Sequence, residues 1–256
     1  MGDGSSCRKT FGGKISCHLC VYISLFLKYF LYNNDIWYKN GDYLGGSNAF
    51  VGVKAHAPQK FAWIHALPEF IGLTGKKCER VYRDFDKIVN VSYASENCFL
   101  KIAPNLKNKC VVVHNFINLS NINVNTVGSN PFESKIVNLL TVARIDNRAK
   151  RIDRVVPIAK KMKELGLSFV WSVIGDGPDL VSIKKCVEDA ELCDTVHCLG
   201  AVSPPFLYMK YADVFVLLSD YEAYPMVVCE SLACGTPVVT TDFPAATEMI
   251  SEGING

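Results

Sequence analysis

The sequence lacks an excess of charge of either sign, since 27 Lys and Arg residues are matched by 25 Asp and Glu residues and the net charge is +2. This balance excludes a dedicated nucleic-acid binder, which needs a clear basic excess. Glycine and proline, at 18 and 11 of 256 residues, are too few for a collagen-like or low-complexity chain. Apolar residues make up 49% and charged residues 20%, as in a globular protein of one or two domains.

Cysteine is present, but not at the density of a small secreted disulfide scaffold. An odd number, 11, is spread over the whole length, which favours a reducing compartment and therefore a cytoplasmic location. The single C-x-x-C, at residues 17–20, has no second pair at zinc-ligand spacing. We interpret it as chance spacing and expect no metal site.

Charge and hydropathy vary along the chain more than the totals suggest. Residues 1–130 carry 15 basic and 8 acidic groups, whereas residues 131–256 carry 12 and 17. The basic half favours an anionic partner, such as a membrane surface, or simply a solvated charged face, and both interpretations stay open. Residues 15–32 are apolar, but Lys28 interrupts them and 18 residues are short for a span, so we favour a buried or membrane-apposed helix.

From about residue 35 the chain alternates short apolar segments with amphipathic ones. Three segments rich in β-branched and aromatic residues predict buried strands: residues 60–65, 86–91 and 109–114. Residues 75–83 and 92–102 predict helices, the second with Ser92 as its N-cap. Residues 115–133 are rich in Asn, Ser and Gly and almost uncharged, which predicts a linker between two modules.

The second half continues the alternation more regularly. Five apolar segments predict strands: residues 136–143, 168–174, 195–199, 213–218 and 237–240. Five segments predict helices: residues 151–165, 179–192, 204–211, 225–233 and the start of one at 245–251. In the first helix, one face is expected to be buried and Gly166 to be the stop; that face comprises Ile152, Val155, Val156, Ala159, Met162 and Leu165. This alternation predicts a doubly wound parallel α/β sheet whose ligand lies at the carboxyl ends of the strands.

Two cations follow the first of these strands. Arg144 and Lys150 could neutralise a diphosphate, Arg through its fork and Lys as a point charge. Because Arg148 and Arg151 lie alongside, a solvated basic loop is an equal alternative.

A glycine turn follows the next strand, at residues 175–178 (GDGP). Gly175 and Gly177 would let the backbone approach a ligand closely and leave helix-start amides free for an anion. The segment is not G-x-G-x-x-G, so the dinucleotide fingerprint is absent, and a tight turn is the alternative.

Two carboxylates eight residues apart form the most specific pattern. Pro225 suits the first position of a helix, which leaves Glu222 in the preceding loop and Glu230 inside the helix. The amides of Met226 and Val227 would then be free donors at the positive helix end. Glu230 lies among apolar neighbours and needs a partner, such as a ribose diol, whereas Glu222 has the alternative role of a partner for the helix dipole.

Glu222-x7-Glu230, followed by residues 231–239 (SLACGTPVV), resembles glycosyltransferase family 4, the retaining enzymes of GT-B fold. The resemblance covers about residues 35–256 in order, including residues 61–65 (FAWIH), 86–92 and 111–115. It implies an α/β, GT-B type architecture with two Rossmann-like doubly wound parallel-sheet domains, the first incomplete. Residues 1–34 would be an unmatched segment, residues 35–130 a partial acceptor-side domain and residues 131–256 the donor nucleotide-sugar-binding domain.

The same resemblance implies roles for individual residues. Arg144 and Lys150 would hold the donor's diphosphate, Glu222 would contact the transferred sugar and His65 would line the acceptor side near the reacting carbon. The remaining donor-binding residues would be Gly175, Gly177, Tyr224, Pro225, Met226 and Val227, with Glu230 on the ribose. The family needs no metal for catalysis and no cofactor, because the substrate is itself a UDP- or GDP-sugar.

The chain also departs from the family pattern. Ala223 and Tyr224 replace the usual Gly-Phe, and the sequence stops at Gly256, so we expect a chain truncated at both ends. Asp84 and Asp86 match the D-x-D motif of the other major glycosyltransferase fold, but they precede a strand instead of following one. We interpret Asp86 as a strand-start residue.

These observations predict a retaining glycosyltransferase that moves a sugar from a nucleotide-diphosphate sugar to a saccharide or lipid-linked acceptor, as in surface-polysaccharide assembly. Peripheral membrane contact at the inner face is included among the expected partners, and nucleic acid is not. The alternatives are a non-catalytic nucleotide-sugar-binding remnant and a sugar-nucleotide epimerase of the same architecture.

Overall fold

The computed structural model describes residues 38–40, 59–66, 75–132 and 136–256. The predictions for residues 1–34, with the apolar stretch 15–32 and the C-x-x-C at 17–20, lie outside the described residues. In the part that is described, no helix is both long and apolar enough to cross a membrane.

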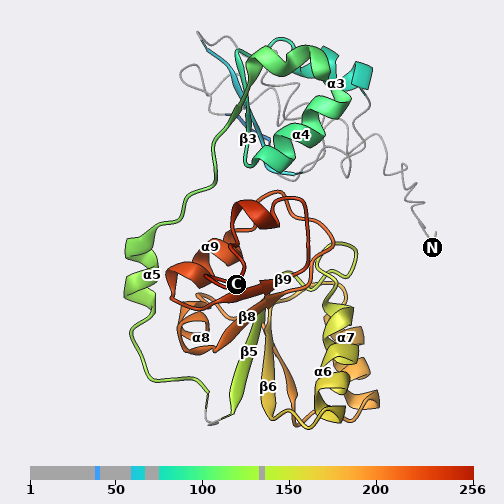
Figure 1. The fold of residues 1–256 in the computed structure, drawn as a ribbon, viewed down its shortest axis with the longest axis vertical. Helices are drawn as coiled ribbons and strands as arrows, with labels where there is room; N and C mark the ends of the chain where they lie inside the picture. The colour runs from blue at the N-terminus through green and yellow to red at the C-terminus, as the bar shows by residue number, and fades with distance from the viewer. Residues whose placement is uncertain (1–37, 41–58, 67–74, 133–135) are drawn as a thin grey trace, which may run out of the picture.

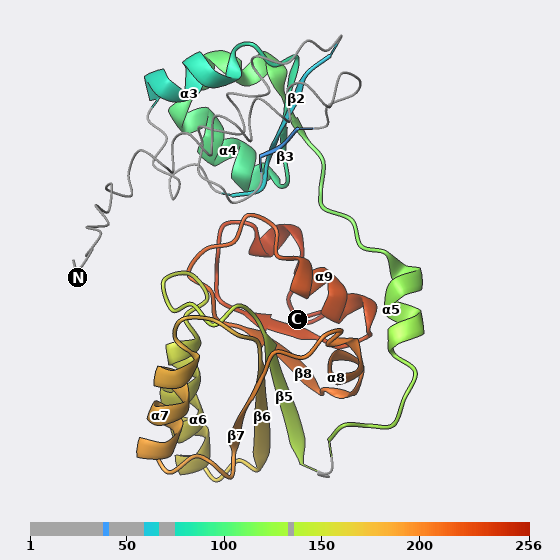
Figure 2. The same cartoon turned by 180° about the vertical axis from the view of Figure 1, so that it is seen from behind.

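The first module is built on a parallel sheet in chain order. Within the described residues, its four strands are β1 (Tyr38–Asn40), β2 (Phe61–Ile64), β3 (Lys87–Asn90) and β4 (Cys110–Val112). The helical elements described in this module are α3 (Gly75–Tyr82), α4 (Tyr93–Ile102) and the 3-10 helix η2 (Pro104–Lys109), and α3 and α4 lie beside β2 and β3 (Figure 2).

Local contacts explain where these elements begin. Ser92 caps α4 as predicted, because its hydroxyl accepts a 2.9 Å hydrogen bond from the Ser95 amide. The carboxylate of Asp86 accepts a 2.6 Å hydrogen bond from the Lys60 amide and so ties the start of β3 to the start of β2. The D-x-D match is therefore a strand-start contact, as the sequence indicates.

The segment predicted to be a linker between two modules contains a helix, α5 (Leu119–Asn125), which Asn118 caps through a 3.2 Å bond from the Asn121 amide. Ile122 is buried in the core of the second module. This apolar anchor holds α5 against helices of the second module, between two extended stretches (Figure 1). The helix within this linker segment was not predicted from the sequence, because a composition poor in charge does not reveal a single buried side chain.

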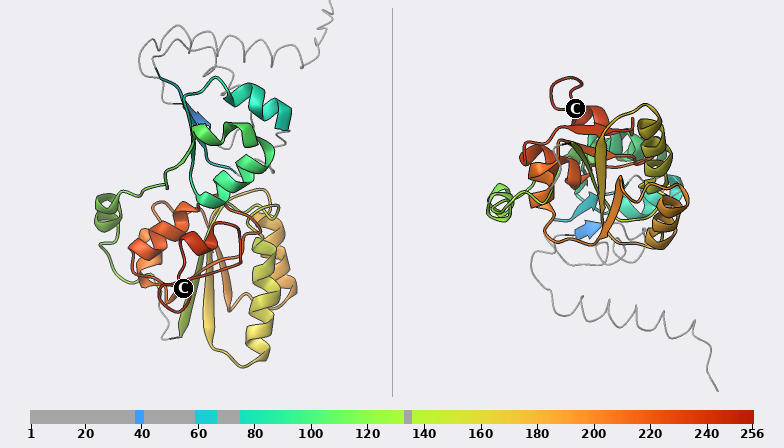
Figure 3. Two further views of the ribbon diagram at one scale, coloured as in Figure 1. Left: turned by 45° about the horizontal axis from the view of Figure 1, so that its top comes forward. Right: turned by 90° about the horizontal axis from the view of Figure 1, so that it is seen from below.

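The second module is a five-stranded parallel sheet in the order β7-β6-β5-β8-β9. The strands are β5 (Val137–Val142), β6 (Phe169–Ile174), β7 (Val196–Gly200), β8 (Val214–Leu217) and β9 (Val238–Thr240). The helices are α6 (Val155–Glu164) and α7 (Leu180–Asp189) on one face, and α8 (Phe206–Tyr211) and α9 (Met226–Ala233) on the other (Figures 1 and 3). The predicted doubly wound α/β architecture is confirmed.

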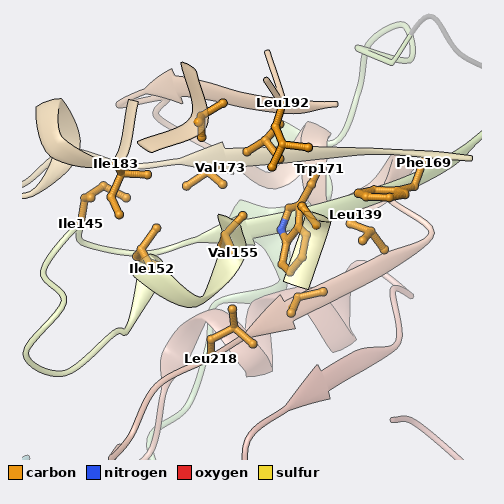
Figure 4. Packing of buried hydrophobic residues seen from close by; sticks show 14 residues of the cluster. Leu139, Ile145, Ile152, Val155, Phe169, Trp171, Val173, Ile183, Leu192 and Leu218 are labelled. Atoms are coloured by element: carbon orange, nitrogen blue, oxygen red, sulfur yellow. The ribbon is translucent and has the colours of Figure 1, made fainter. Parts of the chain in front are cut away.

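The core under α6 and α7 is centred on Trp171, which is 1% exposed (Figure 4). Its indole N–H donates a 3.0 Å hydrogen bond to the Thr141 hydroxyl, which in turn donates to the Val216 carbonyl over 2.8 Å. Burial of so large a ring removes apolar area from water, and the paired N–H avoids the penalty of an unsatisfied polar group. This core holds β5, β6 and β8 together.

Helix ends differ from the predictions in the second module. The predicted helix 151–165 starts as a 3-10 turn, η3 (Ile152–Arg154), after Arg151 with a left-handed φ of 48°. Leu165 is 65% exposed and not on the buried face, because α6 ends at Glu164 and the chain turns away; Gly166, with φ 74°, is the predicted stop.

The last two predicted helices, at residues 225–233 and 245–251, also differ from the observed elements. Pro225 precedes α9 as its N-cap, with an extended ψ of 117°, so the helix begins one residue later than predicted. Residues 245–251 form only a 3-10 turn, η4 (Ala246–Glu248).

Candidate active site

The order of strands in the second sheet creates a switch point between β5 and β8. The chain adds β6 and β7 on one side of β5 and then returns to add β8 and β9 on the other. Loops after β5 and β8 therefore diverge at the carboxyl edge, which is where an open α/β sheet binds its ligand. Lys150 follows β5 and Glu222 follows β8.

Lys150 and Glu222 meet at this point. The Lys150 ammonium donates to Glu222 Oε1 over 2.5 Å, and the Ser219 hydroxyl donates to the same oxygen over 2.7 Å. Both partners are largely covered, with side-chain exposures of 26% and 12%. Among the described residues no hydrogen bond reaches Glu222 Oε2, so that oxygen is available to accept from a ligand hydroxyl.

The arginines of the loop after β5 differ in the partners that their side chains have. Arg148 forms a two-pronged pair with Asp146, at 3.0 and 2.7 Å, and Arg151 is paired with carboxylates. The exposed guanidinium of Arg144 has no hydrogen bond or ion pair anywhere in the described ranges. Arg148 and Arg151 are thus paired with carboxylates of the chain, whereas the binding of an anion by Arg144 stays a prediction.

The N-terminus of α9 lies next to Glu222 in sequence. The Val228 amide bonds to the Pro225 carbonyl at 3.2 Å, but no described group accepts from the Met226 or Val227 amides. Two free N–H groups at the positive end of a helix favour an anionic ligand oxygen.

Glu230 lies in the second turn of α9, half-buried. Desolvation raises the pKa of its carboxyl group. No ion pair or side-chain hydrogen bond to this carboxylate exists within the described part of the chain. A partly desolvated carboxylate without a partner is well suited to a ligand hydroxyl.

At Gly175 and Gly177 the backbone lies close to the backbone of the loop after β5. A Cβ on Gly175 would lie 1.8 Å from the Ala143 carbonyl oxygen, and one on Gly177 would lie 2.3 Å from the Ile145 carbonyl oxygen. The Ile145 amide also bonds to the Asp176 carbonyl at 2.9 Å. The glycines therefore press the loop after β6 against the loop that carries Arg144, and a direct ligand contact stays a prediction.

His65 lies at the carboxyl end of β2, in the first module, where its ring stacks on Trp63 with centroids 6.3 Å apart. Trp63 packs against a buried cluster of Val91, Cys98 and Ala223, the last of which belongs to the loop after β8. The structure thus brings the strand that carries His65 beside the loop that carries Glu222.

Tyr224 is engaged between the modules. Its ring stacks on His114 with centroids 4.9 Å apart, and its carbonyl accepts a 3.3 Å bond from Asn115. Burial raises the pKa of its phenol. The structure shows Tyr224 in these contacts, and its predicted place in the donor site stays untested.

Sequence reasoning missed several residues that shape the site. Ser219, the second partner of Glu222, directly follows the apolar run of β8, and its position at a strand end was a readable signal. His114 and Glu248 each contact the opposite module. No local sequence pattern predicts these contacts, because their partners are far away in the chain.

Comparison with known proteins identifies the family. The sequence profile described as "Glycosyl transferases group 1" matches residues 127–256, and the chain belongs to this family. The amylovoran biosynthesis glycosyltransferase AmsK of Erwinia amylovora is 28% identical over 152 residues, which are 53% of this chain and 37% of that protein. The alpha-monoglucosyldiacylglycerol synthase of Streptococcus pneumoniae is 37% identical over 120 residues, 46% of this chain and 27% of that protein. The chain thus matches well under two thirds of the length of these relatives.

Solved structures confirm the GT-B fold. The Anabaena HepE structure in complex with UDP superposes with a TM-score of 0.69 at 14% identity, covering 92% of this chain and 66% of that one. The lipopolysaccharide outer core galactosyltransferase WaaB in its apo form gives a TM-score of 0.65 at 18% identity, covering 92% of this chain and 64% of that one. At these identities the likeness shows the fold alone.

Proposed function

We propose that this chain acts as a retaining glycosyltransferase of family 4 that moves a sugar from a UDP- or GDP-sugar to a saccharide or lipid-linked acceptor. The observation that carries the proposal is the 2.5 Å contact of Lys150 with Glu222 at the switch point between β5 and β8. The names of the relatives, an amylovoran biosynthesis glycosyltransferase and an alpha-monoglucosyldiacylglycerol synthase, support a role in surface-polysaccharide or glycolipid assembly.

The donor's diphosphate would be held by positive groups from two loops. Lys150 has three N–H donors and uses one on Glu222, so its remaining donors can reach phosphate oxygens. Arg144 adds an exposed guanidinium that no described residue pairs with, and the Met226 and Val227 amides add the positive end of α9. This arrangement stabilises negative charge that develops on the leaving phosphate and needs no metal ion for that purpose.

The two carboxylates would hold hydroxyl groups. Glu222 Oε2 would accept from the transferred sugar, because Oε1 is already occupied by Lys150 and Ser219. Glu230 would accept from the ribose diol and so regain the hydrogen bonds that burial has removed. Gly175 and Gly177 shape the wall of this site through the backbone.

The reaction is a substitution at the anomeric carbon. The bond from this carbon to the diphosphate oxygen breaks and its electron pair stays on that oxygen, while the acceptor oxygen forms the new bond from the same face. The acceptor proton passes to the departing phosphate. His65 would line the acceptor side, and an acceptor at the cytoplasmic face of a membrane is consistent with the basic first half.

Calorimetry with UDP and then GDP, followed by transfer assays with the cognate sugar and acceptor extracts in EDTA, tests the proposal. We expect wild type to bind one nucleotide, Glu230→Ala to lower its affinity about 10-fold, and Lys150→Ala and Glu222→Ala to lower transfer roughly 100-fold. Lys163→Ala is the matched control, since Lys163 pairs with Asp194 on the surface of the same module.

Three outcomes would contradict parts of this function. Unimpaired turnover in both Lys150→Ala and Glu222→Ala would refute the site. Nucleotide binding without transfer would favour the non-catalytic alternative, and conversion of the donor sugar without any acceptor would favour an epimerase.

A further inference from the structure

Lys150 and Glu222 belong to different loops, so their contact depends on how these loops are held together. One backbone link joins them, a 2.9 Å hydrogen bond from the Asp220 amide to the Ala149 carbonyl. Ala149 directly precedes Lys150, and Asp220 lies between Ser219 and Glu222. Contacts that hold Asp220 in place therefore also fix the positions of these two loops relative to each other.

Two arginines hold the Asp220 carboxylate. Arg151 Nη1 donates to Asp220 Oδ2 over 2.9 Å, and Arg154 Nη2 donates to Asp220 Oδ1. The other edge of Arg154 donates to the Leu218 carbonyl over 2.8 Å. The two arginines thus hold the loop after β8 at its first residue, Leu218, and at its third, Asp220.

Arg151 is itself fixed by further contacts. Arg151 bonds to both oxygens of Asp153 at 3.0 Å, and the Asp153 amide bonds to the Asn147 side chain at 3.0 Å. Arg151 also has a left-handed φ of 48°, which a non-glycine residue adopts only when its surroundings enforce it. Arg151 directly follows Lys150, has a strained backbone and is bonded on both edges of its guanidinium. Its contact with Asp220 is therefore part of a fixed network and not an incidental surface ion pair.

We propose that Asp220, held by Arg151 and Arg154, is a positioning residue that sets the Lys150–Glu222 contact. It acts through the two loops and does not touch the donor. The proposal rests on the proposed function for its catalytic consequence, but the contact itself can be measured without turnover.

The first test is chemical labelling of Lys150 with an amine reagent, followed by mass spectrometry of the full chain. Asp220→Asn keeps the shape of the side chain and removes its charge, so we expect Lys150 to be released from Glu222 and labelled several-fold faster. Asp194→Asn is the matched control because it breaks an exposed pair with Lys163, at 3.3 Å, far from these loops in sequence. Arg154→Lys, which keeps the charge but loses the fork, should give an intermediate rate and guards against a variant that fails to fold.

The second test is kinetic. If Asp220 positions Glu222, Asp220→Asn should lower kcat about 10-fold or more with little change in the donor KM, since misplacement affects the transition state most. In a Glu222→Gln background the same change should add almost nothing, because both act through one contact.

The outcomes separate the two proposals. Equal Lys150 labelling in wild type and Asp220→Asn, or full additivity with Glu222→Gln, overturns the positioning role. A wild-type chain that binds no nucleotide and transfers no sugar refutes the proposed function, while the labelling ratio still decides whether Asp220 sets the Lys150–Glu222 contact.

Discussion

At the scale of single residues, charge at this site is organised by pairing. Asp146 and Arg148 are paired with each other beside the site, whereas Glu230 has no ion pair with any residue that the structure describes and Arg144 is exposed. Paired groups keep their charge and fix a loop, and unpaired groups remain able to bind. The division between structural and ligand-binding charges is therefore visible in the contacts and not in residue type.

The Asp146 pair has a consequence for stability against pH. Arg148 lowers the pKa of the buried Asp146 carboxyl from 3.8 to about 2, so the stabilisation is present above about pH 4 and is lost as the pH falls towards 2. Because Arg148 is 80% exposed and water screens the pair, we expect only about 1 kcal/mol. Urea unfolding of Asp146→Asn should show a shallower loss of stability over this range than wild type.

Asp189→Asn is the control for this measurement, since Asp189 is exposed at the end of α7 and has no ion pair among the described residues. A slope for Asp146→Asn equal to that of wild type would show that the pair does not contribute.

At the scale of elements, the loops after β5 and β6 act as one unit. Two backbone hydrogen bonds join them, from Ile145 to Asp176 and from Asp179 to Ile145, and a third joins Ala143 to Ile174 at the end of β6. The glycines at 175 and 177 allow this approach because no Cβ fits against the carbonyls. In the sequence, Gly175 and Gly177 suggested a ligand-binding turn. In the structure, both glycines are needed so that these two loops can pack against each other.

Gly175→Ala should therefore be severe. Its Cβ would lie 1.8 Å from a backbone oxygen that cannot move alone, and its φ is 147°, so we expect a loss of roughly 3 kcal/mol or more in the free energy of unfolding. Gly166→Ala, at φ 74° with nothing within 4 Å, should lose only about 1 kcal/mol. Comparable losses in denaturant melts of the two variants would contradict this account.

At the scale of the whole molecule, the two modules meet through a small set of specific contacts. The Glu248 carboxylate accepts from the Tyr93 and Ala94 amides at 2.9 and 2.7 Å, and so satisfies the N-terminus of α4 from the opposite module. The stack of His114 on Tyr224 adds an aromatic contact beside Glu222. Contacts of this kind tie the first sheet to the loop that carries the site.

Glu248→Ala should loosen this connection. Two helix-start amides lose their acceptor, and we expect about 1 kcal/mol less stability together with faster hydrogen exchange of the Tyr93 and Ala94 amides. Glu252→Ala removes a nearby exposed carboxylate and should leave both unchanged. Unaltered exchange at Tyr93 in Glu248→Ala would mean that the modules are held elsewhere.

What the sequence determined by itself was most of what depends on near neighbours, apart from the exact ends of some helices. Alternating apolar runs of β-branched residues and amphipathic segments specify the strands and helices of the second module, and Ser92 and Gly166 specify ends of helices by their own chemistry. The position of Lys150 and Glu222 after two apolar strands was also readable, because parallel strands end at one edge.

Only the tertiary structure decided which charges pair, because pairing joins residues far apart in the chain. Lys150 and Glu222 are 72 residues apart, and Glu248 reaches Tyr93 across 155. The helix within the linker segment likewise places Ile122 in a core formed by residues distant in the chain. Such contacts depend on the global packing of apolar faces, which local propensity does not encode.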